Sequence, residues 1–380
     1  MNIVKALKLA IFPAMVFAAS CSQASDVDSS DAFTVSEYGT FDRPWAAAFV
    51  PGTQVLMVTE KGGTIRAIDT ASGNEIEIDA LIDVDLGGQG GLGDVAFLPS
   101  EAANTIGSRT IYLSWVEAGS DGTRGAAVGK GLLVCPEATH CTIEGLSVIW
   151  RQVPKVTGRG HFSHRLLISP DEQYLYVSSG DRQKFTPAQD LSTNLGKVLR
   201  LNLDGTPAPE NPFAHMGSPS DEIWSYGHRN VLGLDFDGEG RLWDMEHGPR
   251  GGDELNLVNP GQNYGWPVVS NGIHYDGTPI PDHDTRPDLA APAISWTPVI
   301  GPGNLHFYRG DLFEGWKGNA LIAGMTSNRL VRVAIEGEGA RELARYDVGA
   351  RIRAVIEAPD GALWLLEDGP DGRLLKLTPK

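Results

Sequence analysis

Residues 355–369 read VIEAPDGALWLLEDG, two apolar runs on either side of a short polar segment. An apolar run leads into Pro359, Asp360 and Gly361, and a second apolar run around Trp364 follows. An Asp-Gly pair supplies the positive backbone angles that a tight turn requires, and short apolar runs on either side of such a turn are typical of paired strands. The stretch therefore predicts a β-hairpin.

The same unit recurs along the chain. Copies lie at residues 47–60, 95–115, 166–180 and 234–248, and a weaker copy at 318–335 keeps only the second half. The copies are spaced at roughly 40 to 70 residues, near the size of one propeller blade with its loops. We therefore predict an all-β fold, a six-bladed β-propeller of four-stranded antiparallel sheets. Two separate β-sandwiches, the competing all-β fold, would not repeat one unit across the whole chain.

The composition agrees with many short strands. The chain of 380 residues contains 46 glycines and 24 prolines, and 41% of its residues are hydrophobic. Glycine and proline favour tight turns over long helices, and this apolar content argues against disorder. The formal net charge of -17 repels phosphate backbones, so the composition argues against a nucleic-acid partner.

The N-terminal residues predict export. Lys5 and Lys8 precede an apolar run, and small residues then lead to Cys21, so residues 1–21 resemble a secretory signal. The small residues before Cys21 also resemble a bacterial lipobox, in which that cysteine would be lipidated and would tether the protein to a membrane. We expect residues 22–34 to form a flexible tether, residues 35–380 to form the propeller, and the protein to be periplasmic or anchored to the outer membrane.

Two further cysteines, Cys135 and Cys141, stand close together in the sequence CPEATHC. An even pair in an exported protein predicts a disulfide that closes a short loop. Two buried free thiols are the alternative. A zinc site is less favoured, because His140 between the cysteines would leave the ion without a fourth ligand.

The loops at the hairpin edges carry histidine, arginine and aspartate among glycines. Examples are GRGHFSHR, SSGDR, YGHRN, EHGPRGGDE and GARIRAV. Solvated loops favour Ser, Lys, Glu and Asn, whereas this mixture is expected where backbone and charge crowd around a ligand. In a propeller, the loops on one face converge around the axis, so these residues can meet there.

These motifs resemble the soluble sugar dehydrogenases that depend on pyrroloquinoline quinone (PQQ), and most closely the aldose sugar dehydrogenase branch. The resemblance covers about residue 35 to the C-terminus, and the motifs occur in family order. They are GGQGGLGDVAF, GHFSHRL, GDR, AQDLSTNLGKVLRLNLDG, NPF, YGHRNVLGLDF, EHGPRGGDELNLVNPGQNYGWP and RIRAV. The resemblance implies a six-bladed propeller, which agrees with the number of repeats.

The resemblance also implies catalytic roles. His161 matches the general base that takes a proton from the anomeric hydroxyl of the sugar, and Asp181 matches the acid that orients this histidine. Arg229 matches a residue at the reacting centre that also contacts the quinone. Considered alone, Gly-Asp-Arg at a strand end is more often a turn with an ion pair. His164 stands where the family has a small residue, so we expect it either to crowd the pocket or to compete with His161.

The cofactor and metal sites implied by the resemblance span several loops. The expected PQQ contacts are Gln89, Arg229, Asn230, His247, Asp253, Trp296, Arg351 and Arg353. Calcium bound to the quinone would be held by the carbonyl oxygens of Gly248 and Pro249, and a second, structural calcium by Glu254 and the carbonyl of Tyr264. Without the resemblance, an Arg-x-Arg pair would be interpreted as a solvated strand face.

Two hypotheses remain open at the level of sequence. The first is an exported enzyme that oxidises aldoses to lactones and passes electrons to a quinone or another acceptor. The second is a non-catalytic propeller that binds sugar or protein. A calcium-dependent lactonase would need acidic side chains that converge on the axis, and we find no such set in the sequence. Thr326 replaces a cofactor-binding lysine of the glucose-oxidising branch, and this favours the aldose branch.

Overall fold

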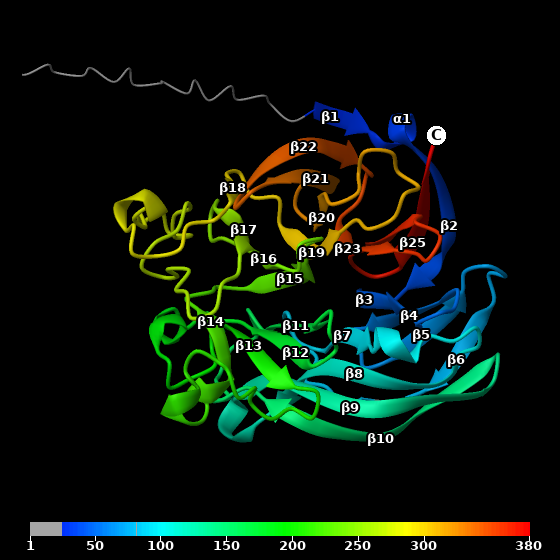
Figure 1. Ribbon diagram of the computed structural model, residues 1–380, viewed down its shortest axis with the longest axis horizontal. Coiled ribbons are helices and arrows are strands. Elements are labelled where there is room, and N and C mark those ends of the chain that lie inside the picture. Colours follow the sequence, from blue (N-terminus) through cyan, green and yellow to red (C-terminus); the bar gives the residue numbers. More distant parts are fainter. Residues whose placement is uncertain (1–24, 81) are drawn as a thin grey trace, which may run out of the picture.

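The computed structural model describes residues 25–80 and 82–380. Its regular secondary structure is mostly antiparallel β-sheet, arranged around a central axis (Figure 1). The expected signal segment and Cys21 lie outside the described residues. α1 (Ser29–Ala32) is the one α-helix in the described part of the chain, and no helix there is long and apolar enough to cross a membrane.

Four-stranded antiparallel runs follow one another along the chain. Their strands are β3 (Pro44–Phe49), β4 (Val55–Glu60), β5 (Ile65–Asp69) and β6 (Glu75–Asp79); β7 (Leu92–Phe97), β8 (Gly107–Ala118), β9 (Arg124–Glu137) and β10 (His140–Arg151); β11 (Ser163–Ile168), β12 (Tyr174–Ser179), β13 (Lys197–Asn202) and β14 (Ile223–Tyr226); β15 (Val231–Phe236), β16 (Leu242–Glu246), β17 (Asp253–Leu257) and β18 (Ile294–Trp296); and β19 (Pro302–Phe307), β20 (Ala320–Gly324), β21 (Arg329–Glu336) and β22 (Gly339–Asp347).

The strands form five sheets. One has eight strands because a short parallel pairing of β6 with β10 joins two of the four-stranded runs. This organisation agrees with the predicted all-β propeller of four-stranded antiparallel sheets. The predicted hairpins are also present: residues 355–369 cover the end of β23 (Ile352–Glu357), the turn and the whole of β24 (Leu363–Glu367).

The C-terminal sheet is completed by a strand from near the start of the described chain. β2 (Phe33–Phe41) pairs antiparallel with β25 (Gly372–Pro379), which continues into β24 and β23. β1 (Ser25–Asp28) pairs in parallel with β22. The structure therefore differs from the expected tether over residues 22–34, because its described part is paired with the sheets and Phe33 is buried in their core.

The strand nearest the axis has a register shift in every run. These irregularities lie between Pro44 and Ala46, Leu92 and Val95, Ser163 and Leu166, Val231 and Gly233, Pro302 and Leu305, and Ile352 and Ala354. An irregularity of this kind bends a strand and redirects its side chains. Each inner strand therefore turns some side chains toward one mouth of the central channel, while its other side chains pack between the sheets.

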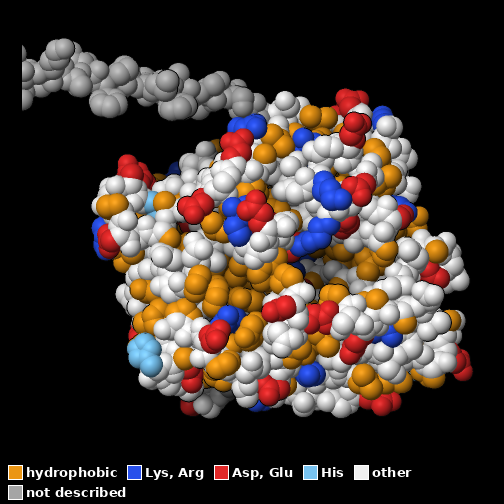
Figure 2. Space-filling model, in the orientation of Figure 1, with side chains coloured by type: hydrophobic (Ala, Val, Ile, Leu, Met, Phe, Trp, Pro, Cys, Tyr) orange, Lys and Arg blue, Asp and Glu red, His pale blue; other side chains and the backbone are white. Residues whose placement is uncertain are grey.

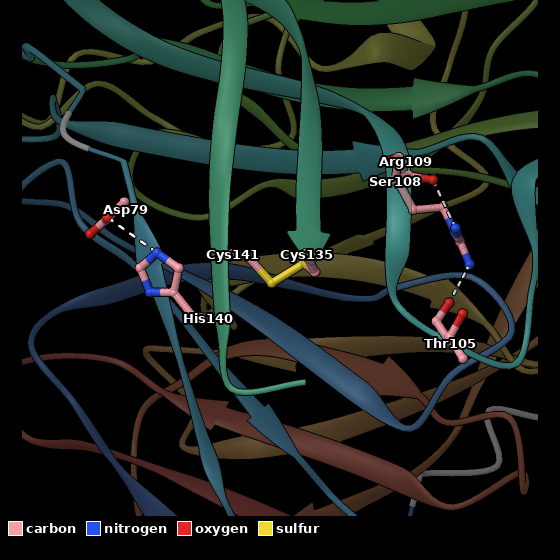
Figure 3. Close-up of a disulfide and its surroundings, with 7 residues drawn as sticks. All are labelled: Asp79, Thr105, Ser108, Arg109, Cys135, His140 and Cys141. Carbon is pink, nitrogen blue, oxygen red and sulfur yellow. Dashed lines mark hydrogen bonds and ion pairs between the residues drawn. A yellow bond between two sulfur atoms is a disulfide. The ribbon is translucent and has the colours of Figure 1, made fainter. Parts of the chain in front are cut away.

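The predicted disulfide is confirmed. Cys135 near the end of β9 and Cys141 near the start of β10 are bonded across the hairpin (Figure 3). His140 points away from the sulfur atoms and lies 3.3 Å from Asp79 through Nε2. The alternatives of two free thiols and of a zinc site at this pair are therefore excluded.

Candidate active site

A cavity of about 370 Å³ lies at one mouth of the channel, and we call it the central cavity. Figure 2 shows basic side chains beside a hollow near the middle of the face seen in Figure 1. The lining comes from segments far apart in the sequence. It comprises Arg43, Trp45, Lys61, Gly88, Gln89, Phe162, Ser163, His164, Asn230, Leu232, His247, Met325, Arg351, Arg353, Asp368, Gly369 and Pro370.

The charge of this lining is strongly positive in a chain whose net charge is negative. Four basic residues face one carboxylate, that of Asp368. Arg351 and Arg353 each donate through Nε to Asp368 at 2.9 Å. Burial would raise the pKa of Asp368, but these two guanidinium groups hold it below its usual value. The lining thus keeps an excess of positive charge, which favours an anionic ligand.

His161, Asp181 and Trp266 form a connected polar chain beside the cavity. Nδ1 of His161 lies 2.7 Å from Oδ1 of Asp181, and the indole N–H of Trp266 donates to Oδ2 of Asp181 at 2.7 Å. Burial lowers the pKa of His161, Asp181 opposes this shift, and Arg229 adds to it. The imidazole is therefore neutral near pH 7, and Nε2 can accept a proton.

The segment that carries His161 has an unusual backbone. His161, Ser163 and His164 adopt φ angles of 49°, 57° and 55°, a region that costs free energy for residues other than glycine. Gln89 accepts the backbone N–H of His161 at 2.6 Å. Arg182 donates to the carbonyls of Gly160 and Gly158 at 2.9 and 2.7 Å. These contacts hold the loop in the orientation that places His161 against Asp181.

His164 lines the central cavity and is held in place by its neighbours. Its ring stacks on Trp45 at 4.8 Å, and Nδ1 lies 2.9 Å from Oγ of Ser114. A Cβ at Gly93 would lie 2.0 Å from Cε1 of His164, so the missing side chain at Gly93 makes room for the ring. Burial lowers the pKa of His164 to about 3, and the ring forms a neutral part of the cavity wall.

Arg229 and Asn230 follow β14 and are fixed by Glu246. Oε2 of Glu246 accepts the backbone N–H of Arg229 at 2.6 Å and that of Asn230 at 3.3 Å. The guanidinium of Arg229 donates to the carbonyl of His247 at 2.9 Å and to the hydroxyl of Tyr275 at 3.2 Å. Its Nε is buried and has no hydrogen-bond partner within the described ranges. This free donor is ready to meet an acceptor that the protein does not supply.

The loop that follows β16 is held by a buried carboxylate. Asp253 accepts the N–H of Gly248 at 2.9 Å and those of Ile300 and Gly301 at 2.9 and 2.7 Å. Burial raises the pKa of Asp253 to about 6. A Cβ at Gly248 would lie 2.2 Å from the carbonyl oxygen of Gly252, so this close approach requires glycine. Asp253 therefore shapes the Gly248–Pro249 loop, because both of its oxygens are occupied by backbone groups.

His247 lines the central cavity, but its ring is also fixed by the backbone. Its Nε2 lies 2.7 Å from the carbonyl oxygen of Pro302. Burial lowers the pKa of His247 to about 3, so the ring is neutral. A second cavity, of about 650 Å³, shares His247 and is bordered by Gly248, Pro249 and Thr326.

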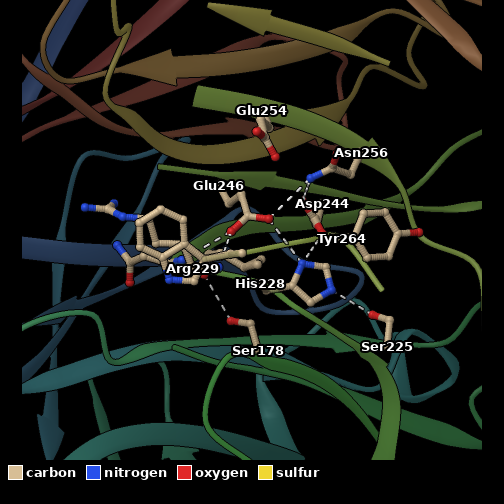
Figure 4. A network of polar contacts seen from close by, with 12 residues as sticks. Ser178, Ser225, His228, Arg229, Asp244, Glu246, Glu254, Asn256 and Tyr264 are labelled. Carbon is tan, nitrogen blue, oxygen red and sulfur yellow. Dashed lines mark hydrogen bonds and ion pairs between the residues drawn. The ribbon is translucent and has the colours of Figure 1, made fainter. Parts of the chain in front are cut away.

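A buried acidic network lies behind this loop (Figure 4). His228, Asp244 and Glu246 place ligand atoms within 4.8 Å of one another. Burial raises the pKa values of Asp244 and Glu254 well above normal, and Glu246 adds to both shifts. A void of about 10 Å³ borders Glu246, Glu254 and Tyr264, room for about one water molecule or ion. The carboxylate oxygens of this network are the ligand type that calcium takes, whereas the imidazole nitrogen of His228 is not.

Most of the expected site residues meet around these cavities, and Trp296 is the exception. Its ring packs in a hydrophobic core with Trp243 and Leu305, and its indole N–H donates to Glu342 at 2.6 Å. The expected cofactor contact of Trp296 is therefore wrong, because β18 is the outer strand of its run. Thr326 borders the second cavity, and the neighbouring Met325 lines the central one.

Several residues of the site were not identified from the sequence. Trp266 and Glu246 stand within quoted motifs, but only the folded chain brings them to Asp181 and Arg229. Arg182 stands in a motif expected to form an ion pair, and it instead binds backbone carbonyls. Lys61 lies in the ordinary turn sequence EKGGT, which gives no signal of a site.

Comparison with known proteins identifies the family. The family model for "Glucose / Sorbosone dehydrogenase" matches residues 41–376. The chain belongs to this family. A relative in Escherichia coli (strain K12), aldose sugar dehydrogenase YliI, is 36% identical over 346 residues, which cover 89% of this chain and 91% of the relative.

Solved structures of this dehydrogenase family agree in fold. The soluble aldose sugar dehydrogenase from Escherichia coli in its apo form matches with a TM-score of 0.83 and 34% identity, covering 92% of this chain and 100% of that one. The PQQ-bound aldose sugar dehydrogenase from Streptomyces coelicolor matches with a TM-score of 0.73 and 28% identity, covering 92% and 98%. These relatives are thus sugar dehydrogenases, and the structure from Streptomyces coelicolor is a PQQ-bound form.

Proposed function

We propose that this protein is a PQQ- and calcium-dependent dehydrogenase that oxidises aldose sugars at the anomeric carbon to lactones. The observation that carries the proposal is the pair of His161 and Asp181, 2.7 Å apart, beside a cavity with an excess of positive charge. A neutral imidazole held by a carboxylate suits a general base, and the charge suits an anionic cofactor. A quinone or another redox partner would accept the electrons.

The residues present fit a tricarboxylic quinone. The buried Nε of Arg229 lacks a partner among the described residues, and the four basic residues of the cavity exceed its one carboxylate. Gln89, Arg229, Asn230, Arg351 and Arg353 would hold the cofactor. When bound, PQQ supplies the two-electron oxidant that takes the hydrogen of the anomeric carbon as hydride.

Calcium fits two places next to this cavity. The carbonyl oxygens of Gly248 and Pro249 are hard ligands in a loop that Asp253 fixes, and they would hold the ion beside the cofactor. Glu254 and the carbonyl of Tyr264 border the small void of the acidic network, where a second ion would offset buried negative charge.

The chain itself supplies the proton transfer. Nε2 of His161 would accept the proton of the anomeric hydroxyl, while Asp181 keeps Nδ1 protonated and stabilises the imidazolium that forms. The ring of Trp266 lies 5.7 Å from that of Phe185, and Tyr275 is held by Arg229. These rings offer an apolar surface near His161 for a pyranose. Loss of the hydroxyl proton and the anomeric hydride leaves the lactone.

The proposal extends to the assembly of the fold and to the location of the protein. Dividing the eight-stranded sheet at the β6–β10 junction gives six four-stranded units around the axis, with β2 completing the last unit. Residues 1–21 would direct export to the periplasm, and lipidation of Cys21 would anchor the protein to the outer membrane. The disulfide between Cys135 and Cys141 supports an oxidising compartment.

Reconstitution tests the enzymatic proposal directly. Purified apoprotein is loaded with PQQ and calcium, and dye reduction is measured with a panel of aldoses. We expect reduction that requires both additions, with the lactone as product. The control is the same protein loaded with PQQ in the presence of a calcium chelator. No dye reduction with any sugar, together with no retained PQQ absorbance, would overturn the proposal in favour of a propeller that only binds sugar or protein.

A further inference from the structure

Lys61 is a basic residue of the central cavity that neither the motifs nor the proposed catalytic set explains. It lies in the turn between β4 and β5, where Glu60 and Thr64 are joined by a backbone hydrogen bond of 2.9 Å. The backbone N–H of Lys61 donates to the carbonyl of Arg43 at 3.1 Å, and Leu92 donates to the carbonyl of Lys61 at 3.0 Å. The turn is thus fixed on both sides and presents the side chain to the cavity.

The ammonium group of Lys61 has no carboxylate to neutralise it. Its Nζ donates to the carbonyl of Gly88 at 2.9 Å, and no acidic oxygen within the described ranges lies within 4.0 Å of it. The adjacent Glu60 is engaged elsewhere, since it accepts the N–H of Asp42 at 2.9 Å and lies 3.5 Å from Arg66. Lys61 therefore differs from Lys155, Lys317 and Lys376, each of which pairs with an acid.

The charged groups near Lys61 add to this excess of positive charge. Burial lowers its pKa, and Arg353 lowers it further, while Asp368 acts in the opposite direction. Asp368 already binds both Arg351 and Arg353, so its charge is shared between two guanidinium groups. A half-buried cation beside two others favours an anion that the chain does not provide.

We propose that Lys61 binds a carboxylate of the cofactor in the central cavity. This inference rests on the proposed PQQ-dependent function. Lys61 lies on the wall of the central cavity near Arg353, whereas Thr326 borders the second cavity. The cofactor carboxylates would then be bound by Lys61, which follows β4, together with Arg351 and Arg353 at β23. An ammonium group with a fixed stem serves as a point charge for one carboxylate, and the paired guanidinium groups serve another.

Direct binding of PQQ to the apoprotein tests the proposal. Titration with PQQ in the presence of calcium is followed by quenching of tryptophan fluorescence, which Trp45 in the cavity wall should report. We expect Lys61→Met to weaken binding about 10- to 100-fold, because it removes one charge-assisted contact. Lys61→Arg should restore most of the affinity. The matched control is Lys317→Met, at an exposed lysine that pairs with the exposed Asp311.

The outcomes separate the two proposals. If wild type binds PQQ and Lys61→Met binds within twofold of Lys317→Met, the role of Lys61 is wrong and the proposed function stands. If wild type does not bind PQQ with calcium present, both are overturned.

A second measurement needs no variant. Lysine methylation of the wild-type protein, mapped by mass spectrometry, should slow at Lys61 when PQQ is added and stay unchanged at Lys317. An equal rate at Lys61 with and without PQQ would overturn the inference even if Lys61→Met failed to fold.

Discussion

The central channel has a cavity at each of its two mouths. The two cavities are similar in volume but differ in how their charged residues are paired. The central cavity occupies about 370 Å³, and a cavity lined by residues further along the same inner strands occupies about 350 Å³. We call the second one the distal cavity. Asp94, Arg165, His306 and Glu357 are among its lining residues. The inner strands β3, β11, β15 and β23 contribute to both cavities, whereas β7 and β19 contribute only to the distal one.

The difference lies in how the charges are paired. In the distal cavity, Nε2 of His306 lies 2.9 Å from Glu357, and Arg165 lies 3.3 Å from Asp94. Arg309, next to this mouth, pairs with Asp235 at 2.7 Å. In the central cavity, Arg351 and Arg353 share the carboxylate of Asp368, and Arg43 pairs with Asp42 at 3.3 Å. Lys61 has no acidic oxygen within 4.0 Å among the described residues. Charges that are satisfied within the chain serve the fold, and charges left over are available to a ligand.

A stack of side chains separates the two mouths. The guanidinium of Arg165 lies 3.9 Å from the ring of Trp45, on which His164 also stacks. Arg165 further donates to the carbonyls of Leu232 and Gly303, each at 2.6 Å. His164 and Trp45 line the central cavity, whereas Arg165 lines the distal one. This stack closes the bottom of the candidate site and lets the two ends differ.

The largest expected difference between the two cavities is seen when one histidine at each mouth is replaced. His161→Gln removes the proposed general base, so we expect turnover of the reconstituted enzyme to fall about 10²- to 10⁴-fold. His306→Gln removes a contact to Glu357 at the distal mouth, so we expect lower stability and unchanged turnover. The measurements are kcat with an aldose and the urea midpoint of each variant.

Two results would contradict this comparison. Equal losses of turnover in both variants would mean that the distal mouth also serves the reaction. Unchanged turnover in His161→Gln would remove the proposed base, provided that the variant still binds PQQ as tightly as wild type.

The next effect is a pH dependence of stability that arises from the wall of the central cavity. Burial lowers the pKa of His164 from 6.5 to about 3. Between these values the unfolded chain binds a proton that the folded chain does not, so the free energy of unfolding decreases as the pH falls. At pH 4.5 the loss should approach about 3 kcal/mol. Urea unfolding from pH 7 to pH 4.5 should show a weaker dependence in His164→Gln.

The control for this prediction is a histidine on the surface. His215 is exposed, so His215→Gln should follow the wild-type pH dependence. Identical pH profiles for wild type and His164→Gln would show that the buried ring does not govern acid stability.

The repeated hairpin made the fold predictable, and the rest of each unit was not visible in the sequence. Five of the copies cover the first two strands of a run, such as β15 and β16, while the weaker copy covers β20 and β21. These strands are largely buried and are joined by turns with a clear sequence signature. Outer strands such as β6 alternate between exposed and buried residues and lack that signature.

The polar segment before the first run shows that composition alone does not predict every strand. Ser25–Asp28 has no apolar pattern, yet its backbone pairs with β22. Backbone hydrogen bonds depend on the neighbouring edge rather than on side-chain type, so only the fold reveals this pairing. Composition therefore predicted a tether where the chain forms a strand.

Residues of the candidate site could be predicted where a side chain suited to proton transfer stands within a recognisable motif. His161 and Asp181 meet as expected, whereas Lys61 and Trp266 join them only because distant turns converge. Trp296 is the opposite case. It is close in sequence to residues of the site, but it lies on an outer strand and packs in a hydrophobic core. Contacts between runs depend on the closure of the ring, which no local pattern encodes.

The smallest expected effect tests the paired charges beside the distal mouth. Asp235 accepts from Arg309 and from the backbone N–H of Phe307 at 2.7 Å, so Asp235→Asn keeps the shape and removes the charge. We expect a loss of about 1 to 2 kcal/mol in the free energy of unfolding, because Arg309 is half exposed and solvent screens its lost partner. PQQ affinity and turnover should equal those of wild type. If Asp235→Asn instead weakened PQQ binding, the charges of the two mouths would be coupled through the Trp45 stack, and the distal cavity could no longer be treated as a purely structural counterpart of the central one.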